Sequence, residues 1–566
     1  MTNAPAVFLK TPHPLKSFGK MAALFTMLIL VSAVAATNAG AQSFSGLYTF
    51  EGLDGGNPTA PLVQGTDGNL YGTTSTFGTL DGVGTVFKIT PAGTLTTIYT
   101  FCQASATCLD GSNPVAPVIQ AIDGNLYGTT FAGGSGNGTV FGMTPDGTPT
   151  MLHRFNVSDG ANPAAGLVQG IDGNFYGTTS AGGANGYGTV FKISPTGKLT
   201  TLYSFNSTDG ASPQGGLIQT TDGNFYGTTN AGGANNSGTV FKITPSSLLT
   251  TIYSFCSQPL CADGSGPVGG LVQGIDSKLY GTTCCDGVNG NGTIFKMTAS
   301  GTLTTLHSFD WTDGASPLAT LIQATDGNLY GTSNNGGYYG PFGTMFEVTP
   351  AGTFTTLYNF CPEGNACSDG ARPAAGLVQH TNGIFYGTAE YGGSEFDLGT
   401  IFSESVGLRP FVRLSRPTGK VGQTVGILGQ GFSGATNVWF AGIPTSFTVV
   451  SDNYLTAPVP EGATTGFVAV GSPKGTLTSS RPFQVTPQIL SFDPPSGPVG
   501  TVVTINGVSL TQTTGVGFGN YVLAKFTVGS DTQISATVPQ GAATGPVGVL
   551  TLGGVAVSSG TFTVTP

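Results

Sequence analysis

Aromatic and acidic side chains gather at two places in the sequence where a repeated pattern changes. An aromatic ring packs well on the apolar face of a sugar, and carboxylates beside it accept hydrogen bonds from sugar hydroxyls. The sequence therefore predicts a glycan-recognition surface, and we take nine residues as its candidates. They are Asp310, Trp311, Tyr338 and Tyr339 in one stretch, and Glu390, Tyr391, Glu395, Phe396 and Asp397 in the next.

Other interpretations of these nine residues stay open. The side chains could simply pack against each other or against a neighbouring domain. The surface could also bind a protein at the cell surface instead of a glycan. Alternatively, two of the carboxylates could act as acid and base in a secreted glycan-cleaving lyase or hydrolase, if they stood about 5 to 9 Å apart across a cleft.

The rest of the sequence offers no catalytic or metal-binding motif. It has no nucleophile elbow, metal-binding helix motif or phosphate loop, so we expect no catalytic residue, no metal and no cofactor. His153 and His307 occupy a strand position that reads Tyr in other repeats, and we expect them to be packing residues. His380 has no Ser or Cys motif near it.

Two sets of polar residues recur along the repeat region. Seven aspartates precede glycine, and they fit tight-turn capping better than a ring of calcium ligands. Seven glutamines end short apolar runs, and we expect them to bond backbone groups between units, because a buried amide must find partners. The aspartates are Asp54, Asp110, Asp159, Asp209, Asp263, Asp313 and Asp369, and the glutamines are Gln64, Gln120, Gln169, Gln219, Gln273, Gln323 and Gln379.

A repeat of about fifty residues supplies the elements that position these side chains. The tetrapeptide Tyr-Gly-Thr-Thr, or a near copy, occurs seven times, with its tyrosine at positions 71, 127, 176, 226, 280, 330 and 386. In the first unit the pattern predicts strands over 62–65, 70–74, 84–90 and 94–101, joined by tight turns. Seven such units without helices indicate an all-β fold, a seven-bladed β-propeller.

The two ends of the repeat region complement each other. The last unit supplies only three strands, over 377–380, 384–388 and 399–404, whereas residues 44–50 match a fourth strand with no first three before it. We expect this segment to complete the last sheet and close a propeller over residues 42–406. Closure leaves the sheet edges short and protected from aggregation.

Six of the eight cysteines fall in pairs at the three junctions between units that carry inserts. These pairs are Cys102 with Cys108, Cys256 with Cys261, and Cys361 with Cys367. We expect local disulfides, each worth about 2 kcal/mol, which form in an oxidising compartment. Zinc is the rival interpretation, but no His lies within ligand spacing. Cys284 and Cys285 could bridge each other or re-pair with Cys256 and Cys261.

The first residues indicate export. Three lysines precede an apolar run over 21–36, and Ala39-Gly40-Ala41 follows, which predicts a signal peptide over 1–41. No later apolar stretch is long enough to span a membrane. The mature chain then carries 15 basic and 28 acidic residues, a net charge of −13. We expect a secreted, extracellular or cell-surface protein, with the periplasm as an alternative, and such a surface disfavours nucleic acid and anionic membranes.

A different pattern, present in two copies, fills the C-terminal part. Pro417-Thr418-Gly419-Lys420-Val421-Gly422 aligns with Pro495-Ser496-Gly497-Pro498-Val499-Gly500, an offset of 78 residues that predicts two tandem β-sandwiches. With Gly429-Gln430-Gly431-Phe432 and Val459-Pro460, these motifs resemble the TIG (or IPT) family of immunoglobulin-like domains, over 411–486 and 487–566. The second copy has Gly507-Val508-Ser509-Leu510 at the position of Gly429-Gln430-Gly431-Phe432, so it lacks the phenylalanine of the first copy. The resemblance implies interaction or spacer modules.

The repeat region itself resembles the Gloeo-Verruco tandem repeat of exported bacterial proteins. The resemblance rests on Asp-Gly-Asn-Phe-Tyr-Gly-Thr-Thr at 172–179 and Gly-Thr-Val-Phe-Lys at 188–192, and it covers about residues 44–406. It implies little chemistry. We therefore expect an exported, nonenzymatic binding or scaffold protein.

Overall fold

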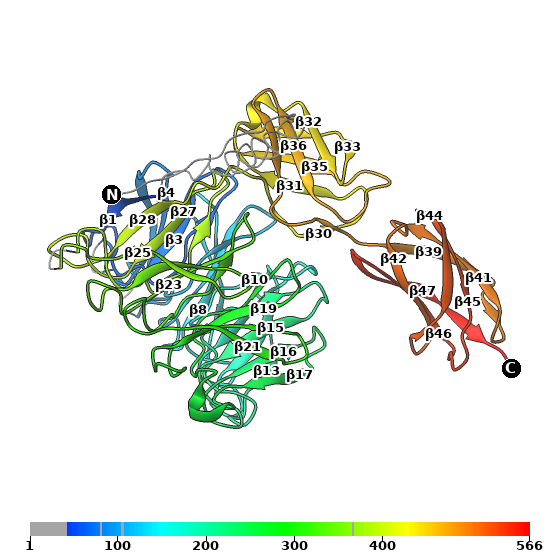
Figure 1. Cartoon of the computed structure of the whole chain (residues 1–566), viewed down its shortest axis with the longest axis horizontal. Helices are drawn as coiled ribbons and strands as arrows, with labels where there is room; N and C mark the ends of the chain where they lie inside the picture. Colours follow the sequence, from blue (N-terminus) through cyan, green and yellow to red (C-terminus); the bar gives the residue numbers. More distant parts are fainter. Residues whose placement is uncertain (1–41, 80–81, 104–106, 365–366) are drawn as a thin grey trace, which may run out of the picture.

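A computed structural model describes residues 42–566, apart from residues 80–81, 104–106 and 365–366 (Figure 1). The leader expected over residues 1–41 lies outside the described residues. The described chain is all-β, and its only helical elements are the short 3-10 turns η1 (Pro259–Cys261) and η2 (Phe432–Gly434). Within the same residues we find no helix with the length and hydrophobicity that a membrane crossing requires.

Seven four-stranded antiparallel sheets, here blades 1 to 7, form the first part of the chain within the described residues. In chain order of the blades, the innermost strands are β2 (Val63–Gln64), β6 (Ile119–Gln120), β10 (Val168–Gln169), β14 (Ile218–Gln219), β18 (Val272–Gln273), β22 (Ile322–Gln323) and β26 (Val378–Gln379). The second strands are β3 (Leu70–Thr74), β7 (Leu126–Thr130), β11 (Phe175–Thr179), β15 (Phe225–Thr229), β19 (Leu279–Thr283), β23 (Leu329–Ser333) and β27 (Phe385–Ala389).

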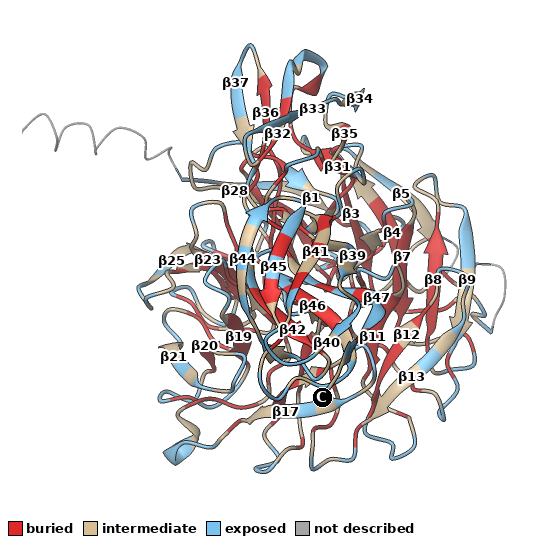
Figure 2. Ribbon diagram, turned by 90° about the vertical axis from the view of Figure 1, so that its right-hand side faces the viewer, coloured by how far each residue is buried: buried red, intermediate tan, exposed pale blue. Residues whose placement is uncertain are grey.

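The third strands are β4 (Thr85–Ile89), β8 (Thr139–Met143), β12 (Thr189–Ile193), β16 (Thr239–Ile243), β20 (Thr293–Met297), β24 (Thr344–Val348) and β28 (Thr400–Ser405). The outermost strands are β5 (Leu95–Thr100), β9 (Pro149–Arg154), β13 (Leu199–Ser204), β17 (Leu249–Ser254), β21 (Leu303–Ser308), β25 (Phe354–Asn359) and, in blade 7, the N-terminal β1 (Ser43–Thr49). Buried positions follow the second and third strands, whereas the outer strands are largely half-buried or exposed (Figure 2).

Packing explains why the repeat spells Tyr-Gly-Thr-Thr. A Cβ on Gly72 would lie 2.4 Å from the Phe87 ring and 2.7 Å from Leu62, so only glycine fits at this crossing of strands. The last threonine, Thr74, shares a 2.7 Å hydrogen bond with the buried hydroxyl of Thr85 on the third strand. The tetrapeptide is therefore a packing motif of the blade.

The ring closes through both ends of the repeat region. Strand β1 pairs antiparallel with β28, and Phe44 lies opposite Glu404. The Phe50 ring then packs edge-on against Phe87 of blade 1, with 5.5 Å between ring centroids. Phe101 and Phe141 make the same contact between blades 1 and 2, at 5.2 Å. The closing junction is thus built like the others.

A circle of glutamine hydrogen bonds joins neighbouring blades around the axis. Gln120 Oε1 accepts from the Thr66 amide at 2.8 Å, and Gln64 Oε1 accepts from the Thr381 amide of blade 7 at 3.1 Å. The other five bonds run from the amides of residues 122, 171, 221, 275 and 325 to Gln169, Gln219, Gln273, Gln323 and Gln379. The expected role of these glutamines, bonding backbone groups between units, is confirmed.

Two β-sandwiches follow. The first pairs sheet β29-β31-β35-β34 with sheet β33-β32-β36-β37, beside the two-stranded β30-β38. Its strands are β29 (Arg413–Leu414), β30 (Thr418–Gly419), β31 (Thr424–Leu428), β32 (Asn437–Phe440), β33 (Ile443–Thr445), β34 (Thr448–Ser451), β35 (Tyr454–Pro458), β36 (Val468–Ser472), β37 (Gly475–Thr478) and β38 (Gln484–Val485).

The second sandwich pairs sheet β39-β41-β45-β44 with the five-stranded β40-β47-β46-β42-β43. Leu510 is fully buried in its core, as Phe432 is in the first sandwich, so a smaller apolar residue fills the place of the missing aromatic. Its strands are β39 (Gln488–Asp493), β40 (Ser496–Gly497), β41 (Val502–Val508), β42 (Thr513–Phe518), β43 (Val522–Leu523), β44 (Lys525–Ser530), β45 (Gln533–Thr537), β46 (Gly545–Thr551) and β47 (Gly554–Val564).

The two faces of the ring carry different connections between strands. One, the hairpin face, carries the tight turns that join first to second and third to fourth strands. The first sandwich bonds to this face, because the Phe411 amide donates to Thr381 O at 3.1 Å and Gln430 Nε2 donates to Thr381 Oγ1 at 2.9 Å. The opposite loop face carries the junctions between blades and the loops between second and third strands.

Candidate functional site

All nine candidate residues lie in loops of the loop face, away from the first sandwich. Asp310 and Trp311 belong to the junction entering blade 6, Tyr338 and Tyr339 to the loop between β23 and β24, and residues 390–397 to the loop between β27 and β28. No hydrogen bond in the described chain joins any of them to a sandwich.

The blade 6 group presents aromatic surface to solvent. Trp311 is 46% exposed and Tyr338 is 80% exposed. Tyr338 and Tyr339 meet edge-on at 5.2 Å, and the Gly337 amide donates to Trp311 O at 2.7 Å, which ties the two loops together.

Asp310 plays a local role in this group. Its Oδ1 accepts from the amides of Thr312, at 3.0 Å, and Asp313, at 3.2 Å. Hydrogen bonds, led by that from the Thr312 side chain, lower the pKa of Asp310. This carboxylate oxygen therefore caps a turn.

The blade 7 group lines an open hollow of about 790 Å³ between the loops of blades 6 and 7. Three of the candidates, Tyr391, Glu395 and Asp397, contribute to it, whereas Glu390 and Phe396 lie next to it in the chain and do not line it. The lining also includes Phe342, Cys367, Ser368, Ala371, Arg372, Gly393 and Ser394. We call this site the blade 7 hollow.

Sequence reasoning missed Arg372 in the blade 7 hollow. Its guanidinium lies 5.8 Å from the centroid of the Tyr391 ring, a cation–π contact. The other blade junctions have Asn, Ser or Gly at this position, as in Asn57 and Ser212, so a comparison of the repeats position by position would have found it. In the part of the chain that the structure describes, the guanidinium makes no hydrogen bond and keeps its donors available.

The carboxylates of this region differ in environment. Asp397 Oδ1 accepts from the Gly392 amide at 2.5 Å and shapes the loop, while Glu395 is exposed and has no partner among the described residues. Burial raises the pKa of Glu390, and the hydrogen bond from Tyr391 and the charge of Arg372 oppose that shift. The charge of Glu390, followed by burial, raises the pKa of Tyr391.

Exposed apolar side chains also extend around the loop face beyond the two predicted stretches. Each of these side chains lies in a junction or in a loop between second and third strands, where polar side chains are expected. Besides Trp311, Tyr338, Tyr339 and Phe396, they are Leu53, Phe77, Leu109, Phe131, Val157, Tyr187, Leu260 and Val288.

Disulfides fix the loop face at four places. The bonded pairs are Cys102–Cys108, Cys256–Cys261, Cys284–Cys285 and Cys361–Cys367. Cys284 and Cys285 thus bridge each other and do not re-pair with the neighbouring junction. Cys367 lines the blade 7 hollow, so its disulfide holds one wall of that site.

The recurrent aspartates cap the junctions. Tyr358 Oη donates to Asp369 Oδ2 at 2.8 Å, and the Cys361 amide donates to the same carboxylate. His153 and His307 replace this tyrosine, and their Nε2 atoms lie 3.1 and 2.8 Å from Asp159 and Asp313. These histidines therefore bond to the cap as well as pack. No group of side chains in the described residues is arranged to hold a metal ion.

Comparisons with known proteins identify both parts of the chain. A family model described as the Gloeobacter/Verrucomicrobia repeat matches residues 33–222, 103–274 and 208–402, and the IPT/TIG domain model matches residues 411–485 and 487–565. No curated protein is significantly similar to the chain.

Solved structures resemble the chain weakly. A surface glycan-binding protein from Prevotella bryantii matches at 17% identity and TM-score 0.22, over 27% of this chain and 41% of that one. A protein of a xyloglucan utilization locus in Bacteroides uniformis matches at 21% identity and TM-score 0.14, over 27% and 48%. The chain therefore spans less than half the length of these two proteins.

A fungal alcohol oxidase in complex with copper matches at 12% identity and TM-score 0.44, over 79% of this chain and all of that one. All three TM-scores lie below 0.5, and we draw nothing about function from them. The family models, in contrast, cover most of the sequence. The chain belongs to the Gloeobacter/Verrucomicrobia repeat family and carries two IPT/TIG domains after its repeats.

Proposed function

We propose that the protein is an exported, nonenzymatic carbohydrate-binding protein whose site is the blade 7 hollow. The observation that carries this proposal is the meeting of the Tyr391 ring, the Arg372 guanidinium and the Glu395 carboxylate in one open hollow on the free face of the ring.

The chemistry of the hollow suits a hydroxyl-rich, uncharged ligand. An aromatic ring packs against the apolar face of a pyranose. A guanidinium donates hydrogen bonds to neighbouring hydroxyls, and a carboxylate accepts hydrogen bonds from them. Arg372 offsets one of the two carboxylates, Glu395 and Asp397, so the hollow keeps one net negative charge and does not favour a polyanion. The exposed aromatic side chains of blade 6 would extend the surface along a longer glycan.

Export is part of the proposal. The leader pattern over residues 1–41 directs secretion, and four disulfides require an oxidising compartment to form and persist. The two C-terminal sandwiches would act as spacers or contacts on the hairpin side, which leaves the loop face free for glycan.

A glycan array tests the proposal. The labelled mature protein should bind a defined set of neutral glycans, and Tyr391→Ala and Arg372→Ala should each weaken binding about tenfold or more, a loss of roughly 1.4 kcal/mol. Tyr187→Ala removes an exposed aromatic side chain from the same face in blade 3 and should leave binding unchanged. Binding that survives both blade 7 substitutions would contradict this site.

The same glycans separate binding from cleavage. After incubation with the protein, a bound glycan should be recovered intact by mass spectrometry. Release of shorter products that disappears in Glu395→Gln would replace the binding proposal by the glycan-cleaving alternative, in which Glu395 acts as an acid or base.

A further inference from the structure

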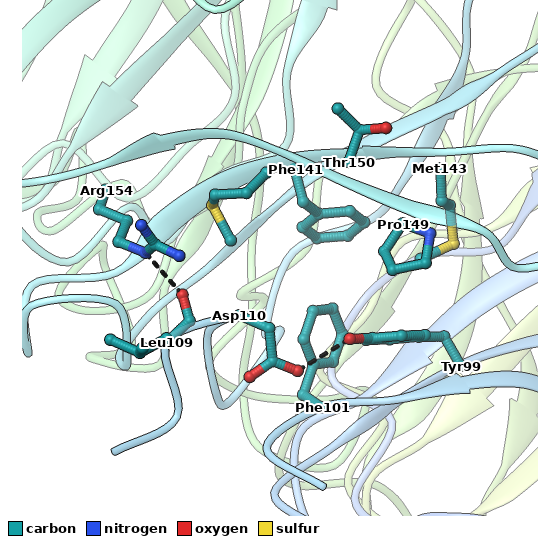
Figure 3. Close-up of a pocket in the computed structure, with 10 residues that line it drawn as sticks. Tyr99, Phe101, Leu109, Asp110, Phe141, Met143, Pro149, Thr150 and Arg154 are labelled. Atoms are coloured by element: carbon teal, nitrogen blue, oxygen red, sulfur yellow. Dashed lines mark hydrogen bonds between the residues drawn. The ribbon is translucent and has the colours of Figure 1, made fainter. Parts of the chain in front are cut away.

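A second, apolar pocket lies on the side of the ring, between the outer strands of blades 1 and 2 (Figure 3). Its volume is about 350 Å³, within the range of small-molecule pockets of roughly 300 to 1,000 Å³. The floor is apolar, because Phe101, Phe141 and Met143 are at most 2% exposed. Tyr99, Met151 and Pro149 complete the walls.

One departure from the repeat opens this pocket. Pro149 begins the outer strand of blade 2 and lies opposite Met143. The equivalent residue in blade 3 is Leu199, which lies opposite Ile193. In every other blade a large apolar side chain at this position packs into the core between blades, whereas Pro149 is exposed and lies outside it. The packed residues are Leu95, Leu199, Leu249, Leu303, Phe354 and, from β1, Phe44.

Replacing a leucine by a smaller residue leaves a space that the surroundings do not refill, because protein interiors are close-packed. Met151 also departs from the repeat, which has Thr at the equivalent positions 97, 201, 251, 305 and 356. Blade 2 therefore lacks the large apolar side chain at position 149 and has the flexible apolar side chain of Met151 beside the space. Together these two changes leave an apolar pocket that a ligand can fill.

The mouth of the pocket carries a fixed cation. Arg154 stands where blade 3 has Ser204, and its Nε donates to Leu109 O at 2.8 Å, which holds the guanidinium at the rim (Figure 3). Its terminal nitrogens have no partner among the described residues. Asp110 lies across the mouth, and its Oδ2 accepts from Tyr99 Oη and the Cys102 amide, both at 2.9 Å.

From these contacts we propose that the pocket between blades 1 and 2 binds a small amphiphile, with an aromatic or aliphatic ring against Phe101 and Phe141 and a carboxylate on Arg154. The bidentate geometry of a guanidinium favours a carboxylate over a hydroxyl at the rim. This site is separate from the blade 7 hollow and does not depend on glycan binding.

The test uses the mature full-length protein and 2-naphthoate as probe, with binding followed by calorimetry. We expect one saturable site. Pro149→Leu restores the side chain of the other blades and should weaken binding at least tenfold, while Pro149→Ala keeps the space open and should bind within about twofold of the parent. The melting temperature of each variant shows that it is folded, and filling the space should raise that of Pro149→Leu.

Two further measurements address the ligand class. Arg154→Gln should lower the affinity for 2-naphthoate about tenfold. The affinity for 2-naphthalenemethanol, which lacks the charge, should change much less. Leu248→Ser removes an exposed apolar side chain elsewhere on the ring and should have no effect. Undiminished binding in Pro149→Leu, an equal loss in Leu248→Ser, or equal affinity of the parent for the acid and the alcohol would each overturn the proposal.

Discussion

The hydroxyl of Thr381 accepts a hydrogen bond from the side-chain amide of Gln430 at 2.9 Å and so joins blade 7 to the first sandwich. The same hydroxyl accepts from Gln64 Nε2 of blade 1 at 2.8 Å. Thr381 is fully buried. One threonine therefore connects the closure of the ring with the attachment of the C-terminal domains.

Gln430→Ala should loosen the first sandwich from the ring without unfolding either. Removing the donor leaves the Thr381 hydroxyl with its bond from Gln64 and a long 3.5 Å bond to Gly429 O of the sandwich, and the segment entering the sandwich becomes the main tether. Small-angle scattering should report a larger radius of gyration and a broader distance distribution. Gln533→Ala, at an exposed site in the second sandwich, should leave the scattering curve unchanged.

Gln64→Ala should destabilise the ring at its closing junction. The Thr381 amide and hydroxyl would both lose a buried partner, which costs about 1 to 3 kcal/mol. Urea unfolding followed by intrinsic fluorescence measures the change. A free energy of unfolding equal to that of the parent would show that the glutamine circle adds nothing to closure.

Glu404 should make the stability of the ring depend on pH. It is fully buried where other blades have Ile, Met or Val, and its carboxyl oxygens have no hydrogen-bond partner within the described ranges. Burial raises its pKa to about 7, against a smaller lowering effect of the nearby Gln42 side chain. The neutral form is favoured in the folded state, so the stability that it contributes is complete below pH 4.5 and is lost as the pH rises through 7.

Glu404→Gln should remove this dependence. The difference in free energy of unfolding between parent and variant should change by about 3 kcal/mol between pH 4.5 and pH 8, because each pKa unit corresponds to about 1.4 kcal/mol. Denaturant titrations across that range measure it. Glu461→Gln, at an exposed position, should follow the parent at every pH.

The disulfide beside the blade 7 hollow should matter for ligand binding more than its counterpart in blade 2. Replacing Cys361 and Cys367 together by Ser, or Cys102 and Cys108 together by Ser, should cost about 2 kcal/mol of stability in each case. Only the first change frees a wall of the hollow. Glycan affinity should therefore fall in the Cys361/Cys367 variant alone, and equal affinities in the two variants would argue against a role for that wall.

The repeated features of the fold could be predicted from sequence because the same sequence pattern recurs in each unit. Strands in the first unit were expected over 70–74 and 84–90 and lie at Leu70–Thr74 and Thr85–Ile89. Packing between blades requires the same side chains in each copy, so the strand register and the turns can be predicted from the sequence. The glutamine circle was predictable for the same reason, since a recurrent amide on an inner strand needs a recurrent partner.

Features that depend on volume or on one local bond were not predictable. The pocket at Pro149 exists because one side chain is missing from a packed interface, and no pattern states the size of a gap. The turn-capping role of Asp310 likewise depends on hydrogen bonds from two backbone amides nearby in the chain. Arg372 lies outside the pattern of aromatic and acidic residues that predicts the site, and only its difference from the Asn, Ser or Gly of the other blades marks it.

The pairing of Ser43 with Ser405 has a consequence for biogenesis. The first strand to leave the ribosome has no partner until blade 7 has been made, so the torus cannot lock before residue 405 has been synthesised. Contacts between such distant residues form slowly, because a very long chain segment must first be brought together. A secretory channel that accepts only unfolded polypeptide would thus meet a substrate whose own topology delays closure of the torus until its seventh blade has been made.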